Sequence, residues 1–175
     1  PSPDSGAAAP VGARPVDGKG SATSGPDDPL DGYWAQLCAF AGIELDDLPM
    51  MRATIDGTRR RASYNGGFVV VRRDSDVLRR THDIFFTSFR NDLRPRGCGD
   101  DVKASTGMVG TEASEWWGSS QAALSTAIWS STRDVHEYDA AYNIPAHALA
   151  DPDQPWPTIE PVLVHYHYLA EPKYQ

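Results

Sequence analysis

Two short runs of polar residues in this chain have the types and spacing that can do chemistry. The first is Tyr64-Asn65-Gly66-Gly67, which leads directly into the apolar segment Phe68-Val69-Val70-Val71. The two glycines can take positive φ angles and let a ligand approach the backbone, while the Asn65 amide offers a donor and an acceptor. The run therefore predicts either a ligand-binding corner or a plain tight turn before a core strand.

The second run is His165-Tyr166-His167, inside the β-compatible segment 162–169. Alternate residues of a strand share a face, so we expect both imidazoles on one side and the neighbouring tyrosines on the other. Two imidazoles on one face can bind a divalent metal or a phosphate, provided that further ligands come from elsewhere. The alternative is a pair of structural histidines whose ring nitrogens bond to backbone carbonyls at a sheet edge.

The sequence around these runs predicts alternating helices and strands. Apolar residues recur at helical spacing in the helical segments, and Gly42 and Pro95 end the first and second of these. Asp56-Gly57 between β-compatible runs predicts a hairpin, and the apolar segment 68–72 lacks alternation, so it predicts a strand covered on both faces. We expect helices at 31–41, at 75–93 and from 114 onward, and strands at 51–55, 58–64, 68–72, 135–138 and 162–169. Strands interleaved with helices predict an α/β fold with a mixed sheet flanked by helices.

Residues 1–30 differ in composition from the rest of the chain. They contain six prolines, five glycines and four serines, with few bulky apolar side chains. Such a segment buries too little apolar surface to offset the entropy lost on ordering. We therefore predict a disordered tail at 1–30 and one domain at 31–175, with polar loops at 94–112 and 151–161.

Charge and composition exclude several classes of protein. The net charge of −8 and the pI near 5.0 argue against a nucleic-acid partner, which needs a clustered basic face. No apolar run reaches the roughly 20 residues of a transmembrane segment, and no signal peptide opens the chain. Cys38 and Cys98 are too few for a disulfide framework or a cysteine-based zinc site. We expect a cytoplasmic protein.

Other charged and aromatic residues allow two interpretations each. Arg59-Arg60-Arg61 can grip phosphates or form a solvated face of a hairpin strand. Trp116, Trp117 and Trp129 can stack on sugar rings or fill the core, and their helical spacing favours the core. Trp156, in the Pro-rich loop, is the better platform for a sugar.

Three of these motifs together resemble a known family. Tyr64-Asn65-Gly66-Gly67, then Gln121 followed by Ala122-Ala123-Leu124, and then Val164-His165-Tyr166 are similar, in this order and spacing, to the signatures of nucleotide-sugar glycosyltransferases with a GT-A fold. The glycogenin-like family 8 and related bacterial transferases are the closest in pattern. Tyr142-Asn143-Ile144-Pro145 falls where a similar turn precedes the late strand. The resemblance covers roughly residues 31–170 and implies a partial GT-A-like mixed sheet flanked by helices.

The resemblance also implies roles for individual residues. Asn65 would contact the donor sugar or the acceptor near the reaction centre, with Tyr64, Gly66 and Gly67 at the same substrate site. Gln121 would lie on the sugar face, where retaining members place an amide close to the anomeric carbon. His165, or His167 one step further, would bind Mn²⁺ or Mg²⁺. Such a cation neutralises the diphosphate leaving group of an oxocarbenium-like transition state.

The chain departs from the family in two places. The family's nucleotide-binding half and its Asp-x-Asp metal motif lie upstream of the Asn-Gly signature, where this sequence has only about 60 residues. Asp74-Ser75-Asp76 has the right letters but follows the strand, so it is better explained as a helix cap. In addition, Ser120 replaces the acidic residue expected beside Gln121.

We therefore expect a fragment: the C-terminal, acceptor-side half of a glycosyltransferase. Its complete form would transfer a hexosyl group from a nucleotide-diphosphate sugar to a carbohydrate or other hydroxyl acceptor, whereas the isolated chain would be inactive. One alternative is a non-catalytic binding or scaffold module derived from that fold. The other is a small metal-binding protein built on His165 and His167.

Overall fold

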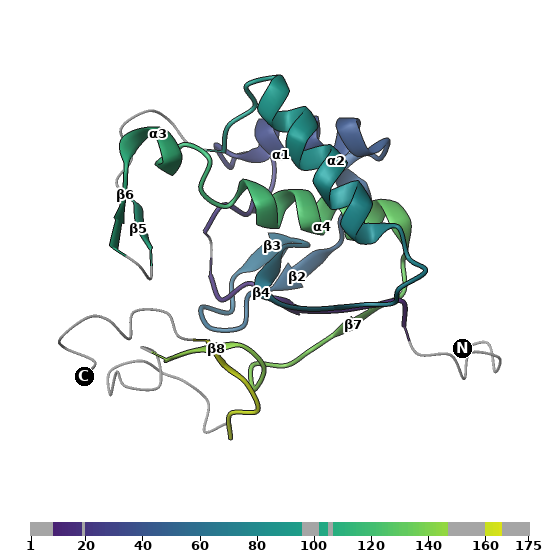
Figure 1. Ribbon diagram of the computed structural model, residues 1–175, viewed down its shortest axis with the longest axis vertical. Helices are drawn as coiled ribbons and strands as arrows, with labels where there is room; N and C mark the ends of the chain where they lie inside the picture. The colour runs from purple at the N-terminus through teal and green to yellow at the C-terminus, as the bar shows by residue number, and fades with distance from the viewer. Residues whose placement is uncertain (1–8, 19, 96–101, 105–106, 147–159, 166–175) are drawn as a thin grey trace.

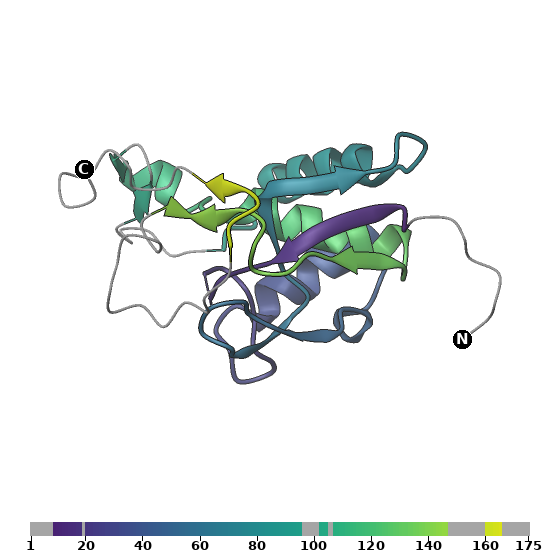
Figure 2. The same ribbon diagram turned by 90° about the horizontal axis from the view of Figure 1, so that it is seen from below.

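The computed structural model of this protein describes residues 9–18, 20–95, 102–104, 107–146 and 160–165. Within them the chain is a mixed α/β structure, in which helices cover one face of a small mixed sheet (Figure 1). The view from below has the strands in front of the helices (Figure 2). The predicted α/β class is therefore confirmed.

The main sheet has three strands in the order β4–β1–β7. Its central strand β1 (Val11–Pro15) is antiparallel to β4 (Tyr64–Val71) and parallel to β7 (Val135–Glu137). All five residues of β1 are buried, and Val11 and Ala13 belong to the hydrophobic core. The strand predicted at 135–138 is confirmed as β7.

The predicted tail at 1–30 is wrong where the structure describes this segment beyond residue 10. Besides β1, Thr23 is fully buried, and the Trp34 indole N–H donates to the Ser21 carbonyl oxygen over 2.7 Å. The segment has few bulky side chains, but β1 pairs with two strands that lie far along the chain. Small residues such as Gly12 and Ala13 suit that position because neighbouring elements pack closely there.

Strand β4 differs from its prediction in two ways. It begins at Tyr64, so residues 64–67 form the first half of the strand, and neither Gly66 nor Gly67 has a positive φ angle. Pairing with β1 overrides the local turn signal of the two glycines. Among the described residues β4 is also an edge strand, and Val70 is 47% exposed, so the strand is not covered on both faces.

The helix layer contains α1 (Asp31–Ala41), α2 (Val77–Arg90), the short α3 (Thr111–Ser114) and α4 (Ser119–Ser131). The helices predicted at 31–41 and 75–93 are confirmed, and Gly42 ends α1 with a φ angle of 74°. Helix α1 contributes Trp34 and Leu37 to the core, and α4 contributes Ala123 and Ala127. None of the helices in the described ranges combines the length and the apolar character needed to cross a membrane.

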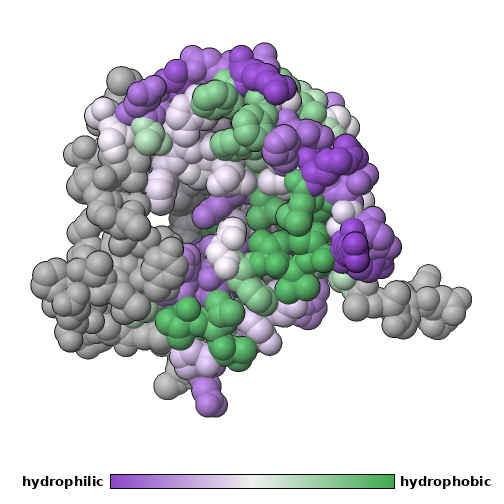
Figure 3. All heavy atoms as spheres, viewed as in Figure 1, coloured by the Kyte–Doolittle hydropathy of each residue, from purple (hydrophilic) through white to green (hydrophobic). Residues whose placement is uncertain are grey.

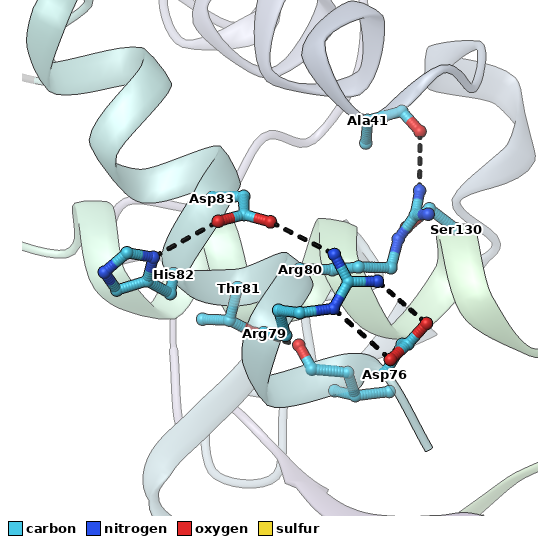
Figure 4. Close-up of polar contacts among 9 residues, drawn as sticks. Ala41, Asp76, Arg79, Arg80, Thr81, His82, Asp83 and Ser130 are labelled. Atoms are coloured by element: carbon cyan, nitrogen blue, oxygen red, sulfur yellow. Dashed lines mark hydrogen bonds and ion pairs between the residues drawn. The ribbon is translucent and has the colours of Figure 1, made fainter. Parts of the chain in front are cut away.

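Arg80, on the side of α2 that faces the other helices, connects the three long helices. The Arg80 guanidinium donates to the Ala41 carbonyl oxygen at the end of α1 over 2.9 Å and to the Ser130 hydroxyl of α4 over 3.0 Å (Figure 4). On the exposed side, Arg79 pairs with Asp76 and Asp83. Asp76 precedes the helix but forms no capping hydrogen bond through its side chain, so its carboxylate serves Arg79 instead.

The remaining elements are short. The predicted hairpin is confirmed as β2 (Met50–Arg52) and β3 (Arg59–Arg61), which follow a 3-10 turn, η1 (Leu45–Asp47). A second hairpin, β5 (Val102–Ala104) and β6 (Gly107–Val109), lies where a loop was predicted at 94–112. Strand β8 (Ile144–Pro145) pairs in parallel with β9 (Val164–His165). Only 164–165 of the strand predicted at 162–169 is therefore seen as strand, and 166–169 lie outside the described residues.

Candidate functional site

The candidate site lies at the end of the main sheet where β1 finishes and β4 begins. Antiparallel pairing puts Pro15 opposite Tyr64, and the Val16 N–H donates to the Ser63 carbonyl oxygen over 3.0 Å. The amino-terminal end of α4 and the β8–β9 pair reach the same place. Three motifs that are far apart in the sequence therefore converge on the first residues of β4.

Gly66 lies against Gln121, in the first turn of α4. A Cβ atom at Gly66 would be 3.4 Å from Cγ of Gln121. The helix is held there because the backbone N–H of Tyr64 donates to the Ser125 hydroxyl oxygen over 2.9 Å. That hydroxyl in turn donates to the Gln121 carbonyl oxygen over 2.8 Å. These two hydrogen bonds hold the backbone at Gln121 beside the start of β4.

Gly67 lies against Asn143 and His165. A Cβ atom at Gly67 would be 2.7 Å from Oδ1 and 2.9 Å from Nδ2 of Asn143, and 3.1 Å from Cε1 of His165. Only a residue without a side chain fits this position without moving its neighbours. Asn143 is 1% exposed and has a φ angle of 56°, a left-handed conformation that asparagine tolerates better than most residues.

An aromatic contact and strand pairing hold this corner in place. The ring of Phe68, the next residue of β4, stacks on that of Tyr142 with a centroid distance of 5.5 Å. Pro145 of β8 pairs with His165 of β9. Asn143, which directly precedes β8, and His165 of β9 thus contact β4 together.

The side chains of Asn65 and Tyr64 make contacts in different parts of the structure. The Asn65 side-chain oxygen accepts the backbone N–H of Gly67 over 3.0 Å, so the Asn65 side chain folds over the glycines. Tyr64 is fully buried; its hydroxyl accepts a bond from Trp129 Nε1 over 3.2 Å and donates to Glu137 Oε1 over 3.4 Å. Burial, with the charge of Glu137 as a second cause, holds the pKa of Tyr64 above its ordinary value. Tyr64 therefore supports the site from the core.

Two residues that the sequence analysis did not select also lie here. Arg14 of β1 is fully buried and forms an ion pair with Asp17, whose carboxylate also accepts the Thr54 hydroxyl over 3.0 Å. A signal for Arg14 was present, because it is the one charged residue in the otherwise apolar run Pro10-Val11-Gly12-Ala13-Arg14-Pro15-Val16. A charge in a buried strand is costly unless it is paired or used. The signal was missed because the segment was assigned to a tail.

The electrostatics around His165 depend on this pair. Burial lowers the pKa of His165; the positive charge of Arg14 also lowers it, whereas the negative charge of Asp17 opposes the shift. The imidazole therefore takes up a proton less readily than a free histidine does.

The described residues of this corner do not by themselves supply a full set of ligands for a divalent cation. In the ranges that the structure covers, no group of three or more His, Cys, Asp or Glu side chains could hold a metal ion. Beside His165 the available carboxylate is that of Asp17, which Arg14 already engages. His167, the other predicted ligand, and Trp156, the predicted sugar platform, lie outside the described residues.

The remaining sequence candidates have structural partners. Trp129 bonds to Tyr64, in accordance with the core interpretation. Arg60 pairs with Asp56 and Arg61 with Asp46, so two of the three hairpin arginines are engaged within the fold.

The assembled site therefore brings side-chain amides and an imidazole close to the backbone of two glycines, with a buried arginine nearby in β1. Searches with this chain against models of known protein families, curated proteins and solved structures find no significant match. What the fold and the site define is an α/β domain with a polar, amide-rich and arginine-containing corner at one end of its sheet.

Proposed function

We propose that this chain is the acceptor-side part of a glycosyltransferase, as its motifs imply by resemblance. In its complete form the enzyme would transfer a hexosyl group from a nucleotide-diphosphate sugar to a carbohydrate or other hydroxyl acceptor. One observation carries the proposal: Gln121 lies against Gly66, while Asn143 and His165 lie against Gly67. Three motifs spread over about 100 residues of sequence thus meet at one point, as a single substrate site requires.

The chemistry of these groups suits a sugar. The hydroxyls of a hexose need both donors and acceptors, which the side-chain amides of Asn65 and Gln121 supply. The Gln121 amide oxygen carries a partial negative charge, which can stabilise an oxocarbenium-like transition state at the anomeric carbon. Gly66 and Gly67 are exposed in β4, so a ring can approach the backbone at this point.

The surface of the sheet supports the idea of an incomplete site. Figure 3 shows hydrophobic surface right of its centre, over β4 and the adjoining end of α2. Val70 of β4 is 47% exposed and Leu78 of α2 is 60% exposed. An apolar edge strand can accept a further strand, and a donor-binding half would have to join the sheet at one of its two edges, of which β4 is one.

We also propose a cytoplasmic location, in line with the buried free thiol of Cys38.

The test is turnover by the full-length protein. We would follow release of nucleoside diphosphate from a panel of uridine, guanosine and adenosine diphosphate hexoses, with and without added oligosaccharide. Asn65→Ala and Gln121→Ala are expected to lower kcat by about 100-fold or more, the usual effect of removing a group that acts in the transition state.

The chain offers matched controls for both substitutions. Asn91 at the end of α2 and Gln36 on α1 are exposed and far from the corner in sequence, so Asn91→Ala and Gln36→Ala should leave turnover unchanged. If the site variants behave like the controls, the assignment of this corner is wrong. Donor binding without any turnover would favour the non-catalytic module instead.

A further inference from the structure

Arg14 is buried with fewer partners than its charge requires. Its side chain is fully excluded from solvent, and one of its terminal nitrogens, Nη2, pairs with Asp17. Nε and Nη1 have no hydrogen-bond partner among the residues that the structure describes. Buried donors are almost always satisfied in folded proteins, so an orphaned pair on a guanidinium calls for an explanation.

A second orphaned donor lies in the same corner. Nδ2 of Asn143 is buried and likewise finds no hydrogen-bond partner within the described part of the chain. Asn143 and His165 both contact the position of Gly67 in β4. Arg14 of β1 precedes Pro15, which pairs with Tyr64 at the beginning of β4. Arg14 and Asn143 therefore both belong to the end of the sheet where β1 finishes and β4 begins.

The charge and hydrogen-bonding character of these groups determine which kind of ligand they can bind. Unsatisfied N–H groups and a permanent positive charge attract oxygen acceptors with negative charge, and they repel a metal cation. Asp17 neutralises part of the charge, and its side chain is 23% exposed, whereas that of Arg14 is fully buried. An incoming anion can take its place on the guanidinium while Asp17 keeps its bond from Thr54.

We propose that Arg14 and Asn143 form a binding site for a phosphate-type oxyanion, in the place where the resemblance implies a divalent cation. The site deepens the proposed function and rests on it for the identity of the natural ligand, which is the diphosphate of the sugar donor. In that role Arg14 supplies the fixed positive charge that stabilises the leaving group. The anion site itself follows from the buried donors alone.

Calorimetric titration of the full chain with inorganic pyrophosphate, in the presence of EDTA, tests the site. Wild type is expected to bind pyrophosphate, and Arg14→Gln to weaken binding more than about tenfold, which corresponds to about 1.4 kcal/mol. Arg79→Gln, on the exposed side of α2, is the matched control and should bind like wild type. Absence of pyrophosphate binding by folded wild type overturns the proposal.

Asp17→Asn gives a result of opposite sign and does not depend on the stability of the arginine variant. The change removes the competing carboxylate charge, so pyrophosphate affinity should rise severalfold, while Asn143→Ala should lower it severalfold. If binding instead requires Mn²⁺ and falls in Asp17→Asn, then Asp17 is a metal ligand and the proposal is wrong. An unchanged affinity in both variants overturns it as well.

The two proposals fail in distinguishable ways. Pyrophosphate binding that depends on Arg14, together with no turnover of any nucleotide sugar, leaves the anion site intact and removes the transferase function. Conversely, turnover can depend on Gln121 while Arg14→Gln changes neither turnover nor pyrophosphate binding. That result supports the transferase function and removes the anion site.

Discussion

Adding one methyl group at Gly67 should have a different effect from adding it at Gly66. In Gly67→Ala the new Cβ would lie 2.7 Å and 2.9 Å from the side-chain oxygen and nitrogen of Asn143. Ordinary contacts between non-bonded heavy atoms are about 3.5–4.0 Å, so the methyl group is roughly 0.6 Å or more too close. Asn143 is fully enclosed and cannot swing away.

The expected loss of stability follows from two opposing effects. Overpacking of this kind costs about 1–3 kcal/mol. Because Gly67 does not have a positive φ angle, alanine also removes freedom from the unfolded chain, which stabilises by about 0.4–1 kcal/mol. The free energy of unfolding should therefore fall by about 1–2 kcal/mol, and Tm by about 2–4 °C for each kcal/mol in a domain of this size.

Gly66→Ala is the matched control. Its Cβ would be 3.4 Å from the flexible Gln121 side chain, a contact that a small side-chain movement relieves. We therefore expect a change between zero and about 1 kcal/mol of stabilisation. Urea unfolding at 25 °C, followed by Trp fluorescence, measures both variants. In the double variant Gly67→Ala with Asn143→Ala, the second change should restore part of the stability that Gly67→Ala loses, giving a coupling of about 0.5 kcal/mol or more. Equal stabilities of the two glycine variants would refute this account of the corner.

Three further predictions concern the surrounding structure. Arg80→Ala should lower the free energy of unfolding by about 1–3 kcal/mol because it removes the bonds to Ala41 and Ser130. Arg79→Ala removes only exposed ion pairs and should cost under about 1 kcal/mol in the same denaturation assay. Similar losses in the two variants would contradict the role given to Arg80. Because the pKa of Tyr64 is raised in the folded protein, the unfolded chain loses this proton first, and the free energy of unfolding should fall above about pH 10. Tyr64→Phe should reduce this dependence on pH in urea titrations at several pH values. An unchanged dependence on pH would show that Tyr64 is not its source. Burial raises the pKa of the Cys38 thiol to about 12, so a Cys98→Ser chain should react with a thiol reagent only when unfolded, and rapid labelling of the native protein would disprove this.

The parts of the fold that the sequence predicted are those with local signals. Helix α2 could be predicted because its apolar spacing is contained in one segment, although the helix ends at Arg90, before the predicted stop at Pro95. Strand β1 could not, because its burial depends on Val71 and Val135, which lie 60 and 124 residues further along the chain. For Gly66-Gly67 a local turn signal was present, but pairing with β1 outweighs it.

For the candidate site, the sequence predicted which motifs belong together but not how they are held. The order of Asn65, Gln121 and His165 pointed to a single site, and their surroundings meet in the structure around Gly66 and Gly67. The importance of Arg14 could not be judged without knowing that β1 is buried. Its charge becomes informative only when the strand around it is seen to exclude solvent.

The central position of β1 also has a consequence for how the protein folds. As the chain is synthesised, β1 emerges first but can complete its pairing only after β7, at residues 135–137, has emerged. Contacts between such distant segments are slow to form, and until then β1 lacks one of its two neighbours. A chain shortened to 31–175 would lack the strand that joins β4 to β7. The Pro- and Gly-rich beginning of the sequence is therefore part of what makes the rest a single folding unit.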